Sequence, residues 1–169
     1  RSIAQGVYLL GELSPASLDA IQAFGELWST KILATKLASI GIATKWIDSR
    51  QIIRTIAKGD KNIVDIQKTN SRVNEMVEKN SITQLFVLPG FIASDKQGRT
   101  TTLGRGGSDY TAALYAVGCK ARILEIWTDV PGMMTSNPKV VSTARTISNI
   151  SYKAALELSH FGAKVIYPP

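Results

Sequence analysis

Helical and strand-like apolar patterns alternate along the chain, and this alternation is the feature that most constrains the fold. Residues 42–47 and 84–88 are short apolar runs of the kind found in buried strands, and residues 122–127 form a third. Amphipathic stretches separate these runs, as in βαβ units. The sequence therefore predicts an open α/β sheet, mainly parallel, with helices on both faces.

Helix boundaries are marked by capping residues. Ser14 followed by Pro15 is a good helix start, and Gly41 is a good stop, while Gly25 is expected to mark a break or a close contact within that helix. Further helices are predicted over residues 62–79, 108–118 and 151–161.

A polar stretch from Ala93 to Gly107 separates the second strand-like run from the next helix. Loops of this length without structure of their own are usually functional or disordered, so we expect an irregular functional loop here. With 169 residues and no internal repeat or linker, the chain suits about one domain.

The positive charge is dispersed. The chain has 20 Lys and Arg against 13 Asp and Glu, a formal net charge of +7, but no two basic residues are adjacent. Nucleic-acid-binding and membrane-surface proteins more often carry a basic cluster or stripe, so we expect neither partner. No apolar run approaches the roughly 20 residues of a membrane span.

Few residues could hold a metal. Cys119 is the only cysteine and His160 the only histidine, so we interpret the first as a small buried hydrophobe and the second as a helix C-terminal residue. A lone cysteine forms no intramolecular disulfide, which fits a cytoplasmic protein. The tryptophans are most simply core or interface residues: Trp28, Trp46 and Trp127.

The strongest local feature is a glycine-rich loop that runs from Gly104 to Asp109. Its three glycines allow close backbone approach to a ligand, at the N-terminus of a helix that starts near Ser108, where N–H groups favour an anion. Arg105 can hold a carboxylate or phosphate through two hydrogen bonds. Neither a Walker A loop nor a dinucleotide fingerprint is present, and a flexible loop capped by serine is the alternative.

Other polar residues are candidates on weaker grounds. Thr128 and Asp129 follow a predicted strand, where open α/β sheets bind ligands, although an Asx turn explains them equally well. Lys139 and Lys164 could contact phosphates, but a lone lysine is usually a solvated surface group. Glu26 lies in an apolar stretch and is either solvent-facing or paired with a cation.

Taken together, these segments resemble the aspartate kinases of the amino acid kinase family. The matching segments lie in the order of that family and span most of the chain: Phe24–Thr30, Pro89–Ile92, Gly98–Ala113, Glu125–Val141 and Ser151–Pro168. The resemblance implies a three-layer α/β/α sandwich with a mainly parallel central sheet, the amino acid kinase or carbamate kinase-like fold.

The resemblance also implies roles for individual residues. Glu26 would meet the ammonium group of a substrate aspartate, and Arg105 a carboxylate. The acceptor site and the path of the transferred phosphoryl group would be lined by Gly106, Gly107, Ser108 and Asp109, with Arg105 and Asp109 as the catalytic pair. The nucleotide region would contain Thr128, Asp129, Met134, Lys139, Lys164 and Val165.

The implied reaction is transfer of the ATP γ-phosphoryl group to the side-chain carboxylate of L-aspartate, the first step toward lysine, threonine and methionine. Such catalysis consists of positioning and charge stabilisation, with Mg²⁺ bridging the phosphates and no protein metal site. The family has Tyr at Met134, Asp at Asn137, Arg at Lys139 and His at Tyr167. ATP contacts are therefore the least supported part.

The family's Lys-Phe-Gly-Gly-Thr-Ser segment does not precede Glu26, and regulatory domains do not follow Pro169. We therefore expect residues 1–169 to be a single partial kinase domain, inactive alone, prone to self-association, and part of a homo-oligomer, such as a dimer, in its parent. The Thr128–Gly132 turn favours the monofunctional, lysine-sensitive branch over a fusion to homoserine dehydrogenase. Two alternatives remain: a kinase of another acidic amino acid, such as glutamate or acetylglutamate, and a non-catalytic binding module.

Overall fold

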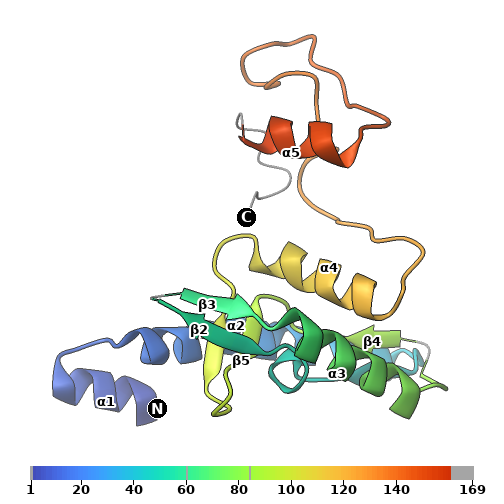
Figure 1. The fold of residues 1–169 in the computed structure, drawn as a ribbon. Helices are drawn as coiled ribbons and strands as arrows, with labels where there is room; N and C mark the ends of the chain where they lie inside the picture. Colours follow the sequence, from blue (N-terminus) through green and yellow to red (C-terminus); the bar gives the residue numbers. More distant parts are fainter. Residues whose placement is uncertain (1, 60, 84, 161–169) are drawn as a thin grey trace. The chain divides into compact units, whose positions relative to one another are not determined.

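The computed structural model describes residues 2–59, 61–83 and 85–160 (Figure 1). The chain divides into two compact units, Arg1–Leu124 and Glu125–Pro169. The elements in chain order are α1 (Ser2–Leu10), α2 (Pro15–Ser39), β1 (Thr44–Trp46), η1 (Ser49–Gln51), β2 (Thr55–Lys58), β3 (Lys61–Val64), α3 (Ile66–Lys79), β4 (Leu85–Val87), β5 (Ile92–Ser94), β6 (Thr100–Thr102), α4 (Gly107–Gly118) and α5 (Tyr152–His160).

The first two predicted strands are confirmed as a parallel pair. β1 and β4 pair in the register Thr44↔Leu85 to Trp46↔Val87. Within the described residues the other two strand pairs, β2 with β3 and β5 with β6, are antiparallel. The chain is therefore a mixed α/β protein, as predicted, and β1 and β4 are its parallel strands.

Helix α2 begins and ends where the capping residues predict. The Ser14 side chain accepts a hydrogen bond from the Ser17 N–H (3.2 Å), Pro15 is the first helical residue, and Gly41 follows the last turn with φ +84°. The predicted break at Gly25 is wrong, because the helix continues through it and no atom crowds its Cα.

One stripe of α2 faces the strands. Its members recur every three or four residues, the spacing of one helix face: Asp19, Ala23, Glu26, Thr30 and Ala34. At one end the Thr102 hydroxyl of β6 donates to Asp19 (2.7 Å), and further along the Trp46 indole of β1 donates to Thr30 (3.0 Å). Ala23 and Ala34 are buried between and beyond these contacts.

In the first unit, Arg1–Leu124, the helices α3 and α4 lie side by side (Figure 1). Val73 and Met76 of α3 pack with Leu114 and Tyr115 of α4 and with Ile53, which is fully buried. Burial raises the pKa of Tyr115, whose hydroxyl donates to Ser49 (2.9 Å). This core fixes the direction in which α4 leaves the glycine-rich loop.

The polar stretch from Ala93 to Gly107 is not the irregular loop expected. It contains most of the β5–β6 hairpin, paired from Ile92↔Thr102 to Ser94↔Thr100. Its polar side chains hid the strands from a periodicity argument, because Ser94 and Thr101 are buried but hydrogen-bonded, Thr101 to Thr55 at 2.9 Å. Residues 95–99 form the turn of this hairpin, and the chain is irregular again from Leu103 to Gly106.

Two further predictions are wrong. Residues 122–127 form no strand and are exposed, and none of the strands that the structure describes pairs with them. Cys119 is not buried but lies exposed at the C-terminal cap of α4. Among the tryptophans, Trp46 packs under Lys31 (5.1 Å to the ring centroid), whereas Trp28 and Trp127 are exposed.

The second unit is mostly irregular. A short antiparallel contact, Met134↔Thr146, closes a loop, with the Thr135 N–H donating to the Arg145 carbonyl (2.9 Å). The predicted last helix is confirmed as α5, whose first turn is capped by the Ser151 hydroxyl (3.2 Å from the Ala154 N–H) and whose last residue is His160. No helix in the described ranges is long and apolar enough to cross a membrane.

Gly118→Ala tests the packing of α3 on α4. A Cβ at Gly118 would lie 2.6 Å from Cγ1 of Val73, a buried and stiff side chain, so we expect the free energy of unfolding to fall by about 1–3 kcal/mol. In a protein that already carries Val73→Ala, Gly118→Ala should lower the free energy of unfolding by less, because the side chain that it meets is smaller. Gly25→Ala is the control, since nothing lies within 4 Å there, and it should stabilise α2 by about 0.5–1 kcal/mol. Urea unfolding followed by circular dichroism measures both, and an unchanged Gly118→Ala protein would contradict this packing.

Candidate functional site

The glycine-rich loop connects β6 to α4 through a tight corner. Gly104 and Gly106 have φ of +70° and +73°, a region in which a Cβ is strained, and the Gly107 N–H donates to the Gly104 carbonyl (3.1 Å). α4 begins after Gly106 without a side-chain cap, so the alternative of a serine cap at Ser108 is wrong. Its first N–H groups are thus not covered by a side chain of the cap residue.

A neighbouring loop holds this corner in place. Phe91 follows β4 with φ +66°, a strained conformation for a bulky residue. Its N–H donates to the Thr111 hydroxyl of α4 (3.0 Å), which in turn donates to the Gly107 carbonyl (2.7 Å). Strain of this kind collects at functional sites, and the buried threonine is what maintains it here.

The two glycines at this contact leave no room for side chains. A Cβ on Gly90 would lie 3.0 Å from the Ser108 Oγ, and a Cβ on Gly107 would lie 3.0 Å from the Leu103 Cβ. The loop after β4 therefore passes directly over the first turn of α4. Since β4 is a parallel strand, this places the start of α4 at the carboxyl end of the pair, where open α/β sheets bind ligands.

Glu26 lies on the α2 stripe that faces the same region. It is half-buried and sits between Asp19, which binds β6, and Thr30, which binds the carboxyl-terminal residue of β1. Seven residues, nearly two helical turns, separate Glu26 from Asp19, so the two side chains leave α2 on one face about 10 Å apart. The stripe thus brings a carboxylate toward the sheet edge at which the glycine-rich loop lies.

The charged residues of the loop are available to a ligand. Arg105 is exposed and makes no ion pair with any residue that the structure describes, while Asp109 is half-buried in the first turn of α4. A guanidinium, a first-turn carboxylate and uncapped N–H groups together suit a ligand that carries both anionic and cationic groups.

The predicted nucleotide residues are in the second unit or beyond the described ranges. The Thr128 hydroxyl donates to Asp129 (3.1 Å), and both are exposed; Met134 and Lys139 lie on the loop that the Met134↔Thr146 contact closes. The Lys139 N–H donates to the Asn137 side chain (3.0 Å), so Asn137 still shapes that loop. Lys164 and Val165 lie outside the described residues.

A built metal site is not part of this arrangement as far as the structure describes it. In the described ranges, no three Asp, Glu, His or Cys side chains lie close enough together to hold an ion. Magnesium would therefore rely on ligands other than a carboxylate cluster of these residues.

Three positioning residues were missed at the sequence level: Asp19, Phe91 and Thr111. The Pro-Gly-Phe tripeptide before β5 was the available signal for Phe91, because such a sequence marks a turn with special backbone geometry. Asp19 and Thr111 carry no such signal, since their partners are distant in the sequence.

Comparison with known proteins gives one consistent result. The model of the amino acid kinase family matches residues 2–169. The chain is 41% identical over 155 residues to the lysine-sensitive aspartokinase 3 of Escherichia coli, covering 92% of this chain and 34% of that protein. It is 32% identical over 169 residues to the bifunctional aspartokinase/homoserine dehydrogenase 1 of Arabidopsis thaliana, covering 99% of this chain and 18% of that protein.

The fold agrees with these relatives. The crystal structure of E. coli aspartokinase III in complex with aspartate and ADP superposes with a TM-score of 0.86 at 37% identity, covering 99% of this chain and 38% of the other. The chain thus has the fold of part of an aspartate kinase and spans about a third or less of the length of the curated relatives described above.

Thr111→Val tests whether Thr111 maintains the corner. Valine has the same shape but leaves the Phe91 N–H without its partner and removes the side-chain bond to the Gly107 carbonyl. We therefore expect the free energy of unfolding to fall by about 1–3 kcal/mol. Thr35→Val, on the exposed side of α2, should change it by less than about 0.5 kcal/mol. Equal effects in urea unfolding would show that the corner does not depend on Thr111.

Proposed function

Because the chain belongs to the amino acid kinase family, we propose that it supplies the aspartate-binding part of an aspartate kinase. The observation that supports the proposal is that the α2 stripe containing Glu26 contacts the last residues of β6 and β1, through Asp19–Thr102 and Thr30–Trp46, and that the Arg105–Asp109 loop follows β6 directly. The names of the relatives, aspartokinases from bacteria and plants, support aspartate as the substrate.

In this proposal each residue meets one group of L-aspartate. Arg105 donates two parallel hydrogen bonds to a carboxylate, and Glu26 accepts from the ammonium group. Asp109 orients the acceptor end of the substrate. Gly106, Gly107 and Ser108 line the path of the phosphoryl group. Glycine allows the backbone to approach that group closely, and the N–H groups at the N-terminus of a helix favour its negative charge.

The reaction is phosphoryl transfer. A side-chain carboxylate oxygen of aspartate forms a bond to the γ-phosphorus of ATP, the bond from that phosphorus to the ADP oxygen breaks, and ADP leaves as 4-phosphoaspartate forms. The protein contributes position and positive electrostatic potential, and no covalent protein intermediate is required.

The nucleotide-binding residues are proposed separately, from the second unit and from positions beyond the described ranges. Thr128, Asp129, Met134, Lys139, Lys164 and Val165 would contact ATP, with the lysines as point charges for phosphates. Magnesium, which neutralises phosphate charge in such reactions, would be held by the phosphates of the nucleotide.

We propose further that residues 1–169 are one part of a kinase domain in a longer, cytoplasmic and homo-oligomeric enzyme, in the branch of the lysine-sensitive relative. Its partners are then L-aspartate and ATP, with no nucleic acid and no membrane. The dispersed basic residues and the single cysteine support this assignment.

Calorimetric titration of the chain with L-aspartate tests the acceptor site. Arg105→Gln should weaken binding about 10- to 100-fold, since a charge-assisted hydrogen bond contributes roughly 1.5–3 kcal/mol, and Glu26→Gln should weaken it by a similar factor. The exposed residues Arg122→Gln and Glu12→Gln are matched controls and should bind as the parent sequence does.

Several outcomes would overturn the assignment. Tighter binding of L-glutamate or acetylglutamate would indicate another acceptor, and unchanged affinity in both site variants would place aspartate elsewhere.

Trapping of the acyl phosphate with hydroxylamine should detect turnover in the longer protein but not in the 169-residue chain. Aspartate binding without turnover in the longer protein would favour a non-catalytic module.

A further inference from the structure

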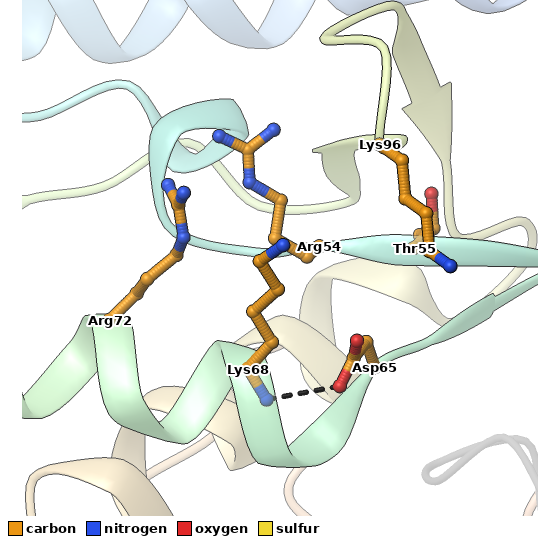
Figure 2. Close-up of a pocket in the computed structure, with 6 residues that line it drawn as sticks. All are labelled: Arg54, Thr55, Asp65, Lys68, Arg72 and Lys96. Carbon is orange, nitrogen blue, oxygen red and sulfur yellow. Dashed lines mark hydrogen bonds between the residues drawn. The ribbon is translucent and has the colours of Figure 1, made fainter.

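A second group of cationic side chains shares no residue with the proposed acceptor site. A cavity of about 100 Å³ is lined by Arg54, which directly precedes β2, by Lys68 and Arg72 of α3, and by Lys96 of the β5–β6 turn, together with Thr55 and Asp65 (Figure 2). A wider cavity of about 500 Å³ shares Arg54 and Arg72 with it.

Arg54 is held at this position by its backbone. Its N–H donates to the Thr69 hydroxyl (3.1 Å), its carbonyl accepts from the Asp65 N–H (2.8 Å), and it forms a bridge with Ser94 of β5. The Arg54 guanidinium donates to the Ser94 Oγ (2.5 Å) and to the Asp95 carbonyl (3.2 Å). These contacts fix the guanidinium while leaving part of it unused.

The unused part is a buried donor. The Nε of Arg54 is inaccessible to solvent and has no hydrogen-bond partner among the described residues. Because water does not reach this atom, a ligand in the cavity does not reach it either, and the unsatisfied donor adds to the cost of keeping the Arg54 guanidinium charged here.

Like charges surround this donor. Figure 2 shows the Arg72 guanidinium beside that of Arg54 and the Lys68 side chain rising toward Arg54. Lys68 and Arg72 are four residues apart on α3, an arrangement of like charges that destabilises a helix. Burial, and then the charge of Arg72, lowers the pKa of Arg54.

The nearby carboxylates are engaged elsewhere. Asp48 forms a bidentate ion pair with Arg50, whose shorter contact is 2.6 Å, and Asp95 forms an ion pair with Arg99 (2.7 Å). Burial opposes ionisation of Asp95, but hydrogen bonds from Arg99 and Gln97 outweigh it and lower the pKa. Asp65, the one carboxylate in the lining of the smaller cavity, caps α3 by accepting from the Lys68 N–H (3.0 Å).

We propose that this cavity binds a phosphate-type dianion, held by Arg54, Arg72, Lys68 and Lys96. Two guanidinium forks and two ammonium groups exceed the charge of a single carboxylate and match a tetrahedral dianion with several acceptor oxygens. The cavity holds one such group, and the wider cavity beside it has room for the rest of a phosphate monoester. The source is therefore either free phosphate or a small phosphorylated metabolite.

Titration of the chain with inorganic phosphate, at ionic strength kept constant with potassium chloride, tests the proposal by thermal unfolding and by ³¹P NMR. Phosphate should raise the unfolding temperature beyond the chloride control and broaden the phosphate resonance. Arg72→Gln should weaken binding at least tenfold, and Arg72→Lys, which keeps the charge without the fork, should have an intermediate effect. Arg122→Gln is the matched control and should bind within twofold of the parent sequence.

Arg54→Gln is a second test, and the binding comparison remains valid if it lowers stability, because the shift caused by phosphate is measured within each variant. A parallel titration with glycerol 3-phosphate distinguishes the sources. Tighter binding of the monoester indicates a phosphorylated metabolite, and binding of phosphate alone indicates the free ion. An effect of phosphate no larger than that of chloride, or an Arg72→Gln protein that titrates like the parent sequence, would overturn the proposal.

Discussion

The two hydrogen bonds of the Thr111 hydroxyl are the interaction on which the proposed acceptor site depends. They connect the strained Phe91 backbone to the first residue of α4, so the loop after β4 and the start of the helix form one rigid corner. Without that connection, a chain that enters α4 through two positive-φ glycines would have many conformations available. A single buried hydroxyl thereby converts a flexible glycine sequence into a defined edge for a ligand.

The β5–β6 hairpin is the common support of both proposed sites. Thr102 of β6 binds Asp19 on the α2 stripe that contains Glu26, and Ser94 of β5 binds the guanidinium of Arg54. Buried threonine and serine hydroxyls, rather than apolar contacts, join this hairpin to its neighbours. Directional hydrogen bonds suit this task, because they fix the orientation of a side chain as well as its depth.

This preference for polar contacts also explains how much could be predicted from sequence. The β1–β4 pair, the helices α2 and α5 and the caps of α2 follow from apolar periodicity and local capping, and the structure confirms them. The hairpin was missed because its buried residues are polar, and their burial depends on partners such as Thr55 that lie far away in the sequence.

The candidate site was predictable in its parts but not in its arrangement. The glycine-rich loop and Glu26 are visible in the sequence, whereas the corner formed by Phe91 and Thr111 depends on a contact across 20 residues. The strand expected over 122–127 failed for a related reason, since a strand needs a neighbouring edge and local composition does not supply one. The cationic cavity likewise brings together residues from three separate segments.

The central claim is that aspartate binds where the loop after β4 meets the start of α4. The most direct measurement is a ¹⁵N NMR titration of the chain with L-aspartate, in which each backbone amide reports on its own surroundings. We predict that the largest chemical-shift changes occur at Phe91 and at Gly106, Gly107 and Ser108. Changes confined to the second unit or to the cavity of Arg54 and Arg72, with these amides unaffected, would contradict it.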